Sequence, residues 1–119
     1  MNRTQHLTVQ AQIALHAALH GVKPSDITGE SKAQRYVFPR KLCFLALVCE
    51  PIGHKTDGTP IYRSLPQIAR YFSDRDHTTV LYGVRSIASQ LYGTPRKATL
   101  AQIRQSVQAH MDSQTQVAA

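Results

Sequence analysis

The sequence predicts one compact all-helical domain, and three observations support that prediction. The chain has 119 residues, 42% of them hydrophobic, which suits a single domain with a modest, mainly aliphatic core. Apolar residues recur at helical spacing in several segments, and helix stops such as Gly21 and Pro51 follow them. Strand signals are confined to residues 52–62. We therefore expect about five to six helices, with a small hairpin or loop insertion at most.

The N-terminal part of the chain holds the first three expected helices. Residues 8–20 carry apolar side chains one helical turn apart, and residues 24–28 begin with a proline that suits a first helical turn. Residues 29–37 are polar and basic, so we expect a loop there. A third helix is expected to begin near Phe38 and to end before Pro51, because proline cannot continue a helix.

The middle of the chain combines turn signals with a fourth helix. Asp57-Gly58 is a turn signal between two short strand-like stretches in residues 52–62. These stretches could pair as a hairpin, although Pro60 counts against it because proline donates no ladder hydrogen bond. The fourth helix is expected over residues 64–72, with Ser64 as its N-cap and a proline in its first turn.

The C-terminal part holds the last two expected helices. The fifth should cover residues 77–92, with an apolar stripe formed by Val80, Val84, Ile87 and Leu91. A final helix is expected over residues 99–111, and the chain from Asp112 onward is expected to fray. On this basis we assign residues 1–95 to the domain proper and residues 96–119 to a C-terminal helix and tail.

Composition favours a polyanionic partner and a reducing compartment. The net charge of +7 and a pI near 9.9 point first to nucleic acid and second to an anionic membrane, while a charge that only aids solubility is the plain alternative. Cys43 and Cys49 lie on different faces of the expected third helix, so they are expected to be free thiols. No signal peptide or membrane span is recognisable. We expect a cytoplasmic, nucleoid-associated protein.

The chain offers little for catalysis or for a cofactor. His16 and His20 are one helical turn apart, as zinc ligands can be, but the sequence suggests no third ligand. No Gly-x-x-x-x-Gly-Lys-Ser/Thr loop, activated nucleophile or carboxylate pair is recognisable. We therefore expect no enzyme activity, no metal and no cofactor.

The densest polar cluster at any expected helix start is Asp76-His77-Thr78-Thr79. Asp76 is a good N-cap, and His77 can donate to or accept from a base edge. Each threonine offers a hydroxyl to a base or phosphate and a methyl group to thymine. Taken alone, the same four residues are also typical of an ordinary capped helix start with no role in binding. Preceded by a short helix and a polar turn, it has the layout of a helix-turn-helix whose second helix enters a DNA major groove.

This stretch resembles the duplex-DNA-binding C-terminal domain of the bacterial replication initiator family, DnaA. The family pattern Ser-Leu-Pro-x-Ile-Gly, an aromatic, then Gly-Gly-Arg-Asp-His-Thr-Thr-Val is matched by Ser64, Leu65, Pro66, Ile68, Phe72 and the block Arg75 to Val80. The likeness extends over roughly residues 9–93. It implies a Trp-repressor-like helix-turn-helix fold.

The resemblance also implies a set of DNA contacts. Asp76, His77, Thr78 and Thr79 would read bases in the major groove, and Leu65 and Pro66 would approach the phosphate backbone. Phe38-Pro39-Arg40-Lys41 resembles the family's Arg-Pro-Arg-Gln, so Arg40 would enter the minor groove, which also makes electrostatic sense in A/T-rich DNA. Together with basic residues nearby, the expected backbone contacts are Lys32, Arg35, Lys41, Arg63, Ser64, Leu65, Pro66 and Arg75.

Three departures from the family pattern affect the expected site. Phe38 stands where the family motif has its first Arg, and the basic loop before it is thinner, with Lys32 and Arg35 remaining. Ser73-Asp74 replaces a pair of glycines, which matters if that turn needs a positive φ, because glycine adopts it more readily than other residues. The segment Pro51–Arg63 is longer than the family's connection and is expected to be either a tolerated surface loop or an additional contact.

The sequence therefore predicts a stand-alone module that binds double-stranded DNA at DnaA-box-like sites without an ATPase. Such a module would regulate transcription or replication initiation in a bacterium or a phage. The alternative is a protein-interaction module of the same fold that binds the initiator or another partner. A homodimer and a contact with a replication or transcription protein both remain open, and no membrane partner is expected.

Overall fold

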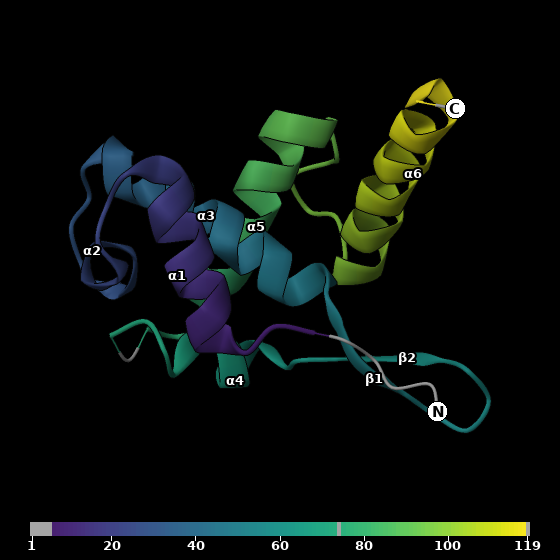
Figure 1. Cartoon of the computed structure of the whole chain (residues 1–119), viewed down its shortest axis with the longest axis horizontal. Coiled ribbons are helices and arrows are strands. Elements are labelled where there is room, and N and C mark those ends of the chain that lie inside the picture. Colours follow the sequence, from purple (N-terminus) through teal and green to yellow (C-terminus); the bar gives the residue numbers. More distant parts are fainter. Residues whose placement is uncertain (1–5, 74, 119) are drawn as a thin grey trace.

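The computed structural model describes residues 6–73 and 75–118, which form a helical domain with one small hairpin (Figure 1). The elements in chain order are α1 (Val9–His20), α2 (Pro24–Thr28), α3 (Gln34–Cys49), β1 (Pro51–His54), β2 (Pro60–Tyr62), α4 (Leu65–Ala69), α5 (His77–Tyr92) and α6 (Leu100–Ala118). The all-helical prediction is confirmed, including the small insertion between the third and fourth helices.

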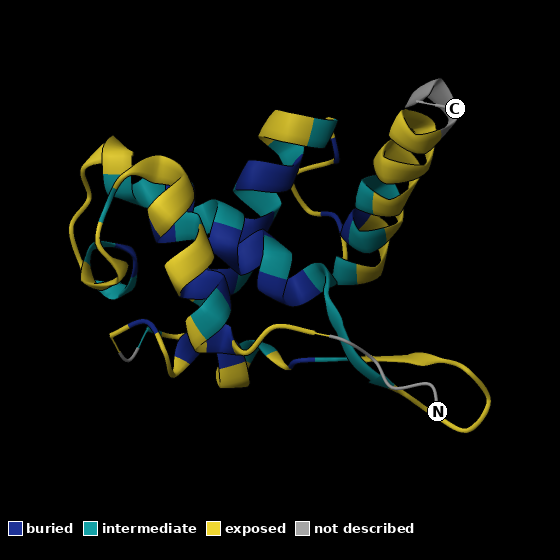
Figure 2. Cartoon of the chain, viewed as in Figure 1, coloured by how far each residue is buried: buried dark blue, intermediate teal, exposed yellow. Residues whose placement is uncertain are grey.

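The core is built around α3, which packs against α1 and α5 and also contacts α2, α4 and α6. Figure 2 shows the buried positions gathered where these helices face one another. Phe44 of α3 meets Phe72 edge-on, with ring centroids 4.7 Å apart, and both rings are buried. Because Phe72 follows α4, this contact fixes the α4–α5 unit against the rest of the domain.

Several element boundaries were predicted correctly because the signals are local. α1 ends at Gly21, whose φ of 66° is left-handed, and α5 covers the expected residues. The expected strands pair as an antiparallel hairpin with an irregularity between Pro51 and Gly53. His54 faces Pro60, which is the first residue of its strand, a position that proline tolerates.

Other boundaries differ from the predictions. α3 begins at Gln34 instead of near Phe38, so that Pro39 lies buried inside the helix and the expected loop is shorter. α4 ends at Ala69 instead of continuing through Phe72. α6 continues to Ala118, past the expected frayed point at Asp112.

The apolar stripe of α5 is only partly buried. Val80, Val84 and Ile87 are fully buried, but Leu91, in the last turn of α5, is 43% exposed. The cysteines are free, as expected: burial raises the pKa of Cys43 to about 12 and that of Cys49 to about 11, so both thiols are protonated at neutral pH.

Candidate nucleic-acid interface

The first turn of α5 presents four polar side chains at the surface. Asp76 is the N-cap, and its Oδ1 accepts a hydrogen bond from the backbone N–H of Thr78 at 3.1 Å. This bond holds the pKa of Asp76 below its usual range. The side chains of Asp76 and His77 are 63% and 55% exposed, Thr78 is half-buried and Thr79 is exposed. The cap thus orders the turn while its side chains stay accessible.

The start of α4 lies next to the start of α5. Ser64 and Gln67 form a capping box, with Ser64 Oγ accepting from the Gln67 backbone N–H at 3.2 Å. Pro66 of this turn lines the same open hollow, of about 300 Å³, as Asp76 and His77. Leu65 is half-buried and Pro66 is exposed, so this helix start also borders the surface. The structure therefore brings together the two helix starts that the sequence singled out.

The turn between α4 and α5 uses the conformation that glycine would favour. Ser73 has a φ of 54°, and its Oγ donates a hydrogen bond to Thr28 O at 2.6 Å. That bond ties the turn to the end of α2. Asp74, the other residue at this departure from the family pattern, lies outside the described residues.

Arg40, the residue expected to enter the minor groove, lies inside the domain. Its side chain is 5% exposed, and its three guanidinium nitrogens donate to backbone carbonyls: Nε to Ile27 at 2.6 Å, and the other two to Ser31 and Asp26, each at 2.9 Å. Burial lowers the pKa of this guanidinium, which remains charged because arginine titrates far above neutral pH. Arg40 thus fixes the α2–α3 connection from inside the domain, and its expected minor-groove contact stays a prediction.

Two expected backbone contacts are also occupied within the fold. Arg63 is 8% exposed and forms an ion pair with Glu50 at 3.1 Å while donating to Leu7 O. Arg75 is half-buried and donates to the carbonyls of Thr28, Gly29 and Phe72. Both guanidinium groups hold backbone carbonyls within the fold, and Arg75 also lines the open hollow beside Asp76 and His77. Their expected phosphate contacts stay predictions.

The remaining expected cations, Lys32, Arg35 and Lys41, lie at or near the surface. Lys32 and Arg35 are exposed, and the guanidinium of Arg35 lies 4.7 Å from the ring centroid of Tyr36. Lys41, on α3, donates to Ser86 Oγ of α5 at 3.2 Å and so lies beside that helix. Because Arg75 binds Gly29, the loop that carries Lys32 is held next to the turn before α5.

Comparison with curated proteins finds similarity to chromosomal replication initiators. The "Chromosomal replication initiator protein DnaA" of Ruegeria sp. (strain TM1040) is 37% identical over 68 residues, which are 57% of this chain and 12% of that protein. The protein of the same name from Thermus thermophilus is 37% identical over 67 residues, or 56% of this chain and 13% of the relative. That from Limosilactobacillus fermentum is 30% identical over 94 residues, or 78% of this chain and 19% of the relative.

The chain is homologous to the C-terminal region of DnaA. It spans less than a fifth of the length of these initiators. The matched part of DnaA is that C-terminal region and not the ATPase region. No protein-family model and no solved structure matches the chain.

Two further structural findings concern this DnaA-like domain. None of the helices in the described part of the chain is long and apolar enough to cross a membrane. Within residues 6–73 and 75–118, no three His, Cys, Asp or Glu side chains gather in a way that could hold a metal ion.

Proposed function

We propose that this chain binds double-stranded DNA by inserting the start of α5 into the major groove. The observation that carries the proposal is the exposed, capped turn Asp76–Thr79 on a helix whose opposite face is buried, in a chain homologous to the C-terminal region of DnaA. A helix presented in this way fits a major groove about 12 Å wide.

The proposed contacts divide into two classes. His77, Thr78 and Thr79 read base edges, and Asp76 both caps the helix and accepts from an exposed base amino group. The backbone is contacted by the start of α4 and by exposed or half-buried cations around it: Ser64, Leu65, Pro66, Lys32, Arg35 and Lys41. Arg40, Arg63 and Arg75 support these residues by holding the loops and helix starts in place.

We infer that the preferred sites are DnaA-box-like, because the side chains proposed to read bases are those the DnaA pattern places at the same positions. A chain that occupies such sites competes with the initiator for them. This would regulate transcription or replication initiation. The chain itself contains no Walker-type phosphate loop, so nothing in it supplies ATP-driven assembly.

The test compares binding to a duplex containing a DnaA box with binding to a scrambled duplex at the same salt concentration, by fluorescence anisotropy. Wild-type protein should prefer the box. Replacing both Thr78 and Thr79 with Ala should lower that preference by at least about tenfold, since each lost base contact costs about 1–3 kcal/mol. The helix cap should survive, because Asp76 accepts from the Thr78 backbone N–H. Equal wild-type affinity for the two duplexes would contradict the proposal.

A protein-interaction role remains the alternative, and the shape of α6 favours it. The second half of α6 projects from the domain, and Met111 on it is 56% exposed (Figure 1). A chain that binds neither duplex in the anisotropy experiment but co-elutes with a purified DnaA initiator would support this alternative.

A further inference from the structure

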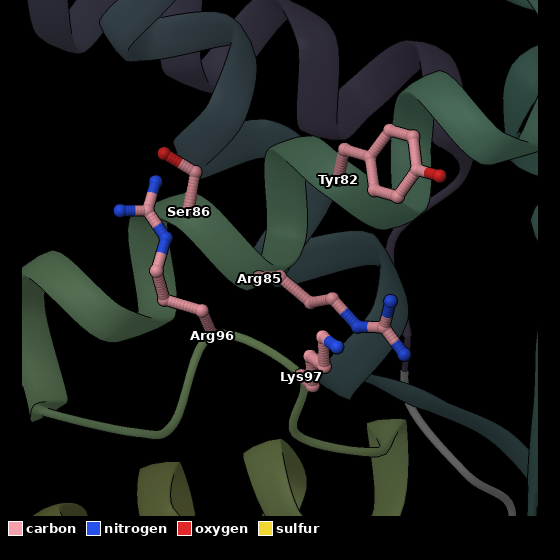
Figure 3. Close-up of a pocket in the computed structure, with 5 residues that line it drawn as sticks. All are labelled: Tyr82, Arg85, Ser86, Arg96 and Lys97. Atoms are coloured by element: carbon pink, nitrogen blue, oxygen red, sulfur yellow. The ribbon is translucent and has the colours of Figure 1, made fainter.

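A basic hollow lies on the side of α5, away from the turn that the sequence singled out. It has a volume of about 440 Å³ and lies between α5 and the connection to α6. Figure 3 shows the five side chains that line it, Tyr82, Arg85, Ser86, Arg96 and Lys97. We call this site the α5–α6 hollow.

The hollow concentrates positive charge that no carboxylate neutralises. The sequence contains no Asp or Glu between Asp76 and Asp112. Within the described residues, Arg85, Arg96 and Lys97 form no ion pair. Arg85 Nε donates to Ala98 O at 3.0 Å, which fixes the base of that guanidinium and leaves its two terminal nitrogens for another acceptor.

The side chains around these cations suit an oxyanion. In Figure 3, Arg96 extends toward Ser86, and Lys97 lies alongside Arg85. Tyr82 is 64% exposed and offers a hydroxyl at the rim. Lys41 Nζ adds a fourth positive charge through its 3.2 Å hydrogen bond to Ser86 Oγ. Guanidinium, ammonium and hydroxyl donors around one open space match the acceptor oxygens of a phosphate group.

The position of the hollow connects it to the proposed DNA interface. Thr79, Tyr82 and Ser86 are three and four residues apart, so they lie on the same face of α5. Thr79 and Ser86 are separated by two helical turns, or about 10 Å along the axis. This is close to the major-groove width of about 12 Å. A residue at this distance from the first turn of α5 is within reach of the groove edge, where the phosphates lie.

We propose that the α5–α6 hollow binds the phosphodiester backbone beside the bases contacted by α5, with Arg85, Arg96 and Lys97 as its cationic ligands. This inference rests on the proposed function and extends its interface to the α5–α6 connection. The contact carries no sequence information of its own, so it raises affinity for every duplex and fixes the orientation of α5 in the groove.

The test measures how DNA affinity depends on salt in the double variant Arg96→Gln/Lys97→Gln. Each phosphate contact contributes about 0.9 to the slope of log affinity against log salt concentration. The slope should therefore fall by roughly 2, while the preference for a DnaA box over a scrambled duplex stays the same. Both side chains are exposed, so the folded state should survive, as circular dichroism would check.

A control variant distinguishes the loss of a local phosphate contact from the loss of overall positive charge. The variant Lys23→Gln/Lys55→Gln also removes two exposed positive charges, from the α1–α2 connection and from the hairpin turn. This control should change the salt dependence of DNA affinity much less than the Arg96/Lys97 variant does. An unchanged slope in the Arg96/Lys97 variant, or an equal change in both variants, would overturn the inference.

A second experiment tests whether the α5–α6 hollow binds the phosphates of DNA or a free anion. Inorganic phosphate is titrated calorimetrically into wild-type protein and into the Arg96/Lys97 variant. Saturable phosphate binding that the variant loses, together with an unchanged DNA salt slope, would show a free-anion site and overturn the backbone contact. A different outcome is also informative. If the wild-type protein binds the DnaA box and the scrambled duplex equally, and the Arg96/Lys97 variant still lowers the salt slope by roughly 2, only the sequence-specific part of the proposed function is contradicted.

Discussion

At the scale of single residues, the arginines of this chain are divided between the fold and the surface. Arg40 and Arg75 each donate to three backbone carbonyls, and Arg104 donates to Val48 O while its guanidinium lies 3.7 Å from the ring centroid of Tyr62. The planar guanidinium suits this use because it presents several donors in fixed directions. The net charge of +7 therefore overstates the charge that faces a partner.

The first prediction at this scale concerns Arg40. Arg40→Lys keeps the charge but cannot reach the carbonyls of Asp26, Ile27 and Ser31 together, so at least one buried acceptor loses its donor. We expect the free energy of unfolding to fall by about 2 kcal/mol, as measured by urea denaturation. Lys32→Arg, at an exposed position, is the control and should leave stability unchanged. A fully stable Arg40→Lys protein would show that these hydrogen bonds contribute little.

The sequence could not separate the two kinds of arginine. Nothing local distinguishes buried Arg40 from exposed Arg35, because burial depends on where α2 and its loop pack. The caps Ser64 and Asp76 were predictable, since each bonds within three residues of itself. The α5–α6 hollow escaped the sequence analysis because Arg85 and Arg96 are brought together by a turn. The absence of acidic residues between Asp76 and Asp112 was the available signal.

At the scale of elements, the starts and stops that are set by one residue were predicted better than those that depend on packing. Gly93 ends α5 with a φ of 69°, as its position suggested. The start of α3 lies at Gln34, upstream of the expected start near Phe38, and Pro39 lies inside the helix. α6 was expected to fray from Asp112 onward. Instead the helix continues, and Asp112 accepts a hydrogen bond from the side chain of Gln108, one helical turn earlier.

The element-scale prediction concerns the contact between α3 and α5 at Gly83. A Cβ atom at this position would lie 3.0 Å from Phe44 Cδ2, and the Phe44 ring is held against Phe72. Gly83→Ala gains about 1 kcal/mol of helix propensity, but overpacking costs about 1–3 kcal/mol. We expect a net loss of stability of about 1 kcal/mol and a lower thermal midpoint. Gln90→Ala, at an exposed position on the same helix, should be neutral or slightly stabilising; a stabilising Gly83→Ala would show that Phe44 moves freely.

At the scale of the whole molecule, one polar cluster joins distant parts of the chain. Glu50, at the end of α3, accepts hydrogen bonds from the backbone N–H of Leu7, from Gln12 and from Arg63. Arg63 in turn donates to the carbonyls of Leu7 and Leu47. The N-terminal segment, α3 and the strand that leads into α4 are therefore fixed to one another. Because Ser64 follows Arg63 directly, this cluster also positions the start of α4 at the proposed interface.

The last prediction is the pH dependence of this cluster. Burial alone would raise the pKa of Glu50, but the hydrogen bonds from Leu7, Arg63 and Gln12 outweigh it, and the pKa lies below its ordinary value. A carboxylate whose pKa is lower in the folded state than in the unfolded state stabilises the fold above the unfolded pKa, about 4.3. That contribution is lost as the pH falls through the folded value.

Urea denaturation of wild-type protein and of Glu50→Gln across roughly pH 3 to 7 checks this prediction. The variant should be less stable near neutral pH, because Arg63 loses its ionic partner in a buried setting. The gap between the two proteins should narrow as the pH falls below about 4, where the wild-type carboxylate also becomes neutral. Asp57→Asn, in the exposed hairpin turn, is the control and should show only a small gap. A constant gap between wild type and Glu50→Gln would mean that the charge of Glu50 does not stabilise the fold.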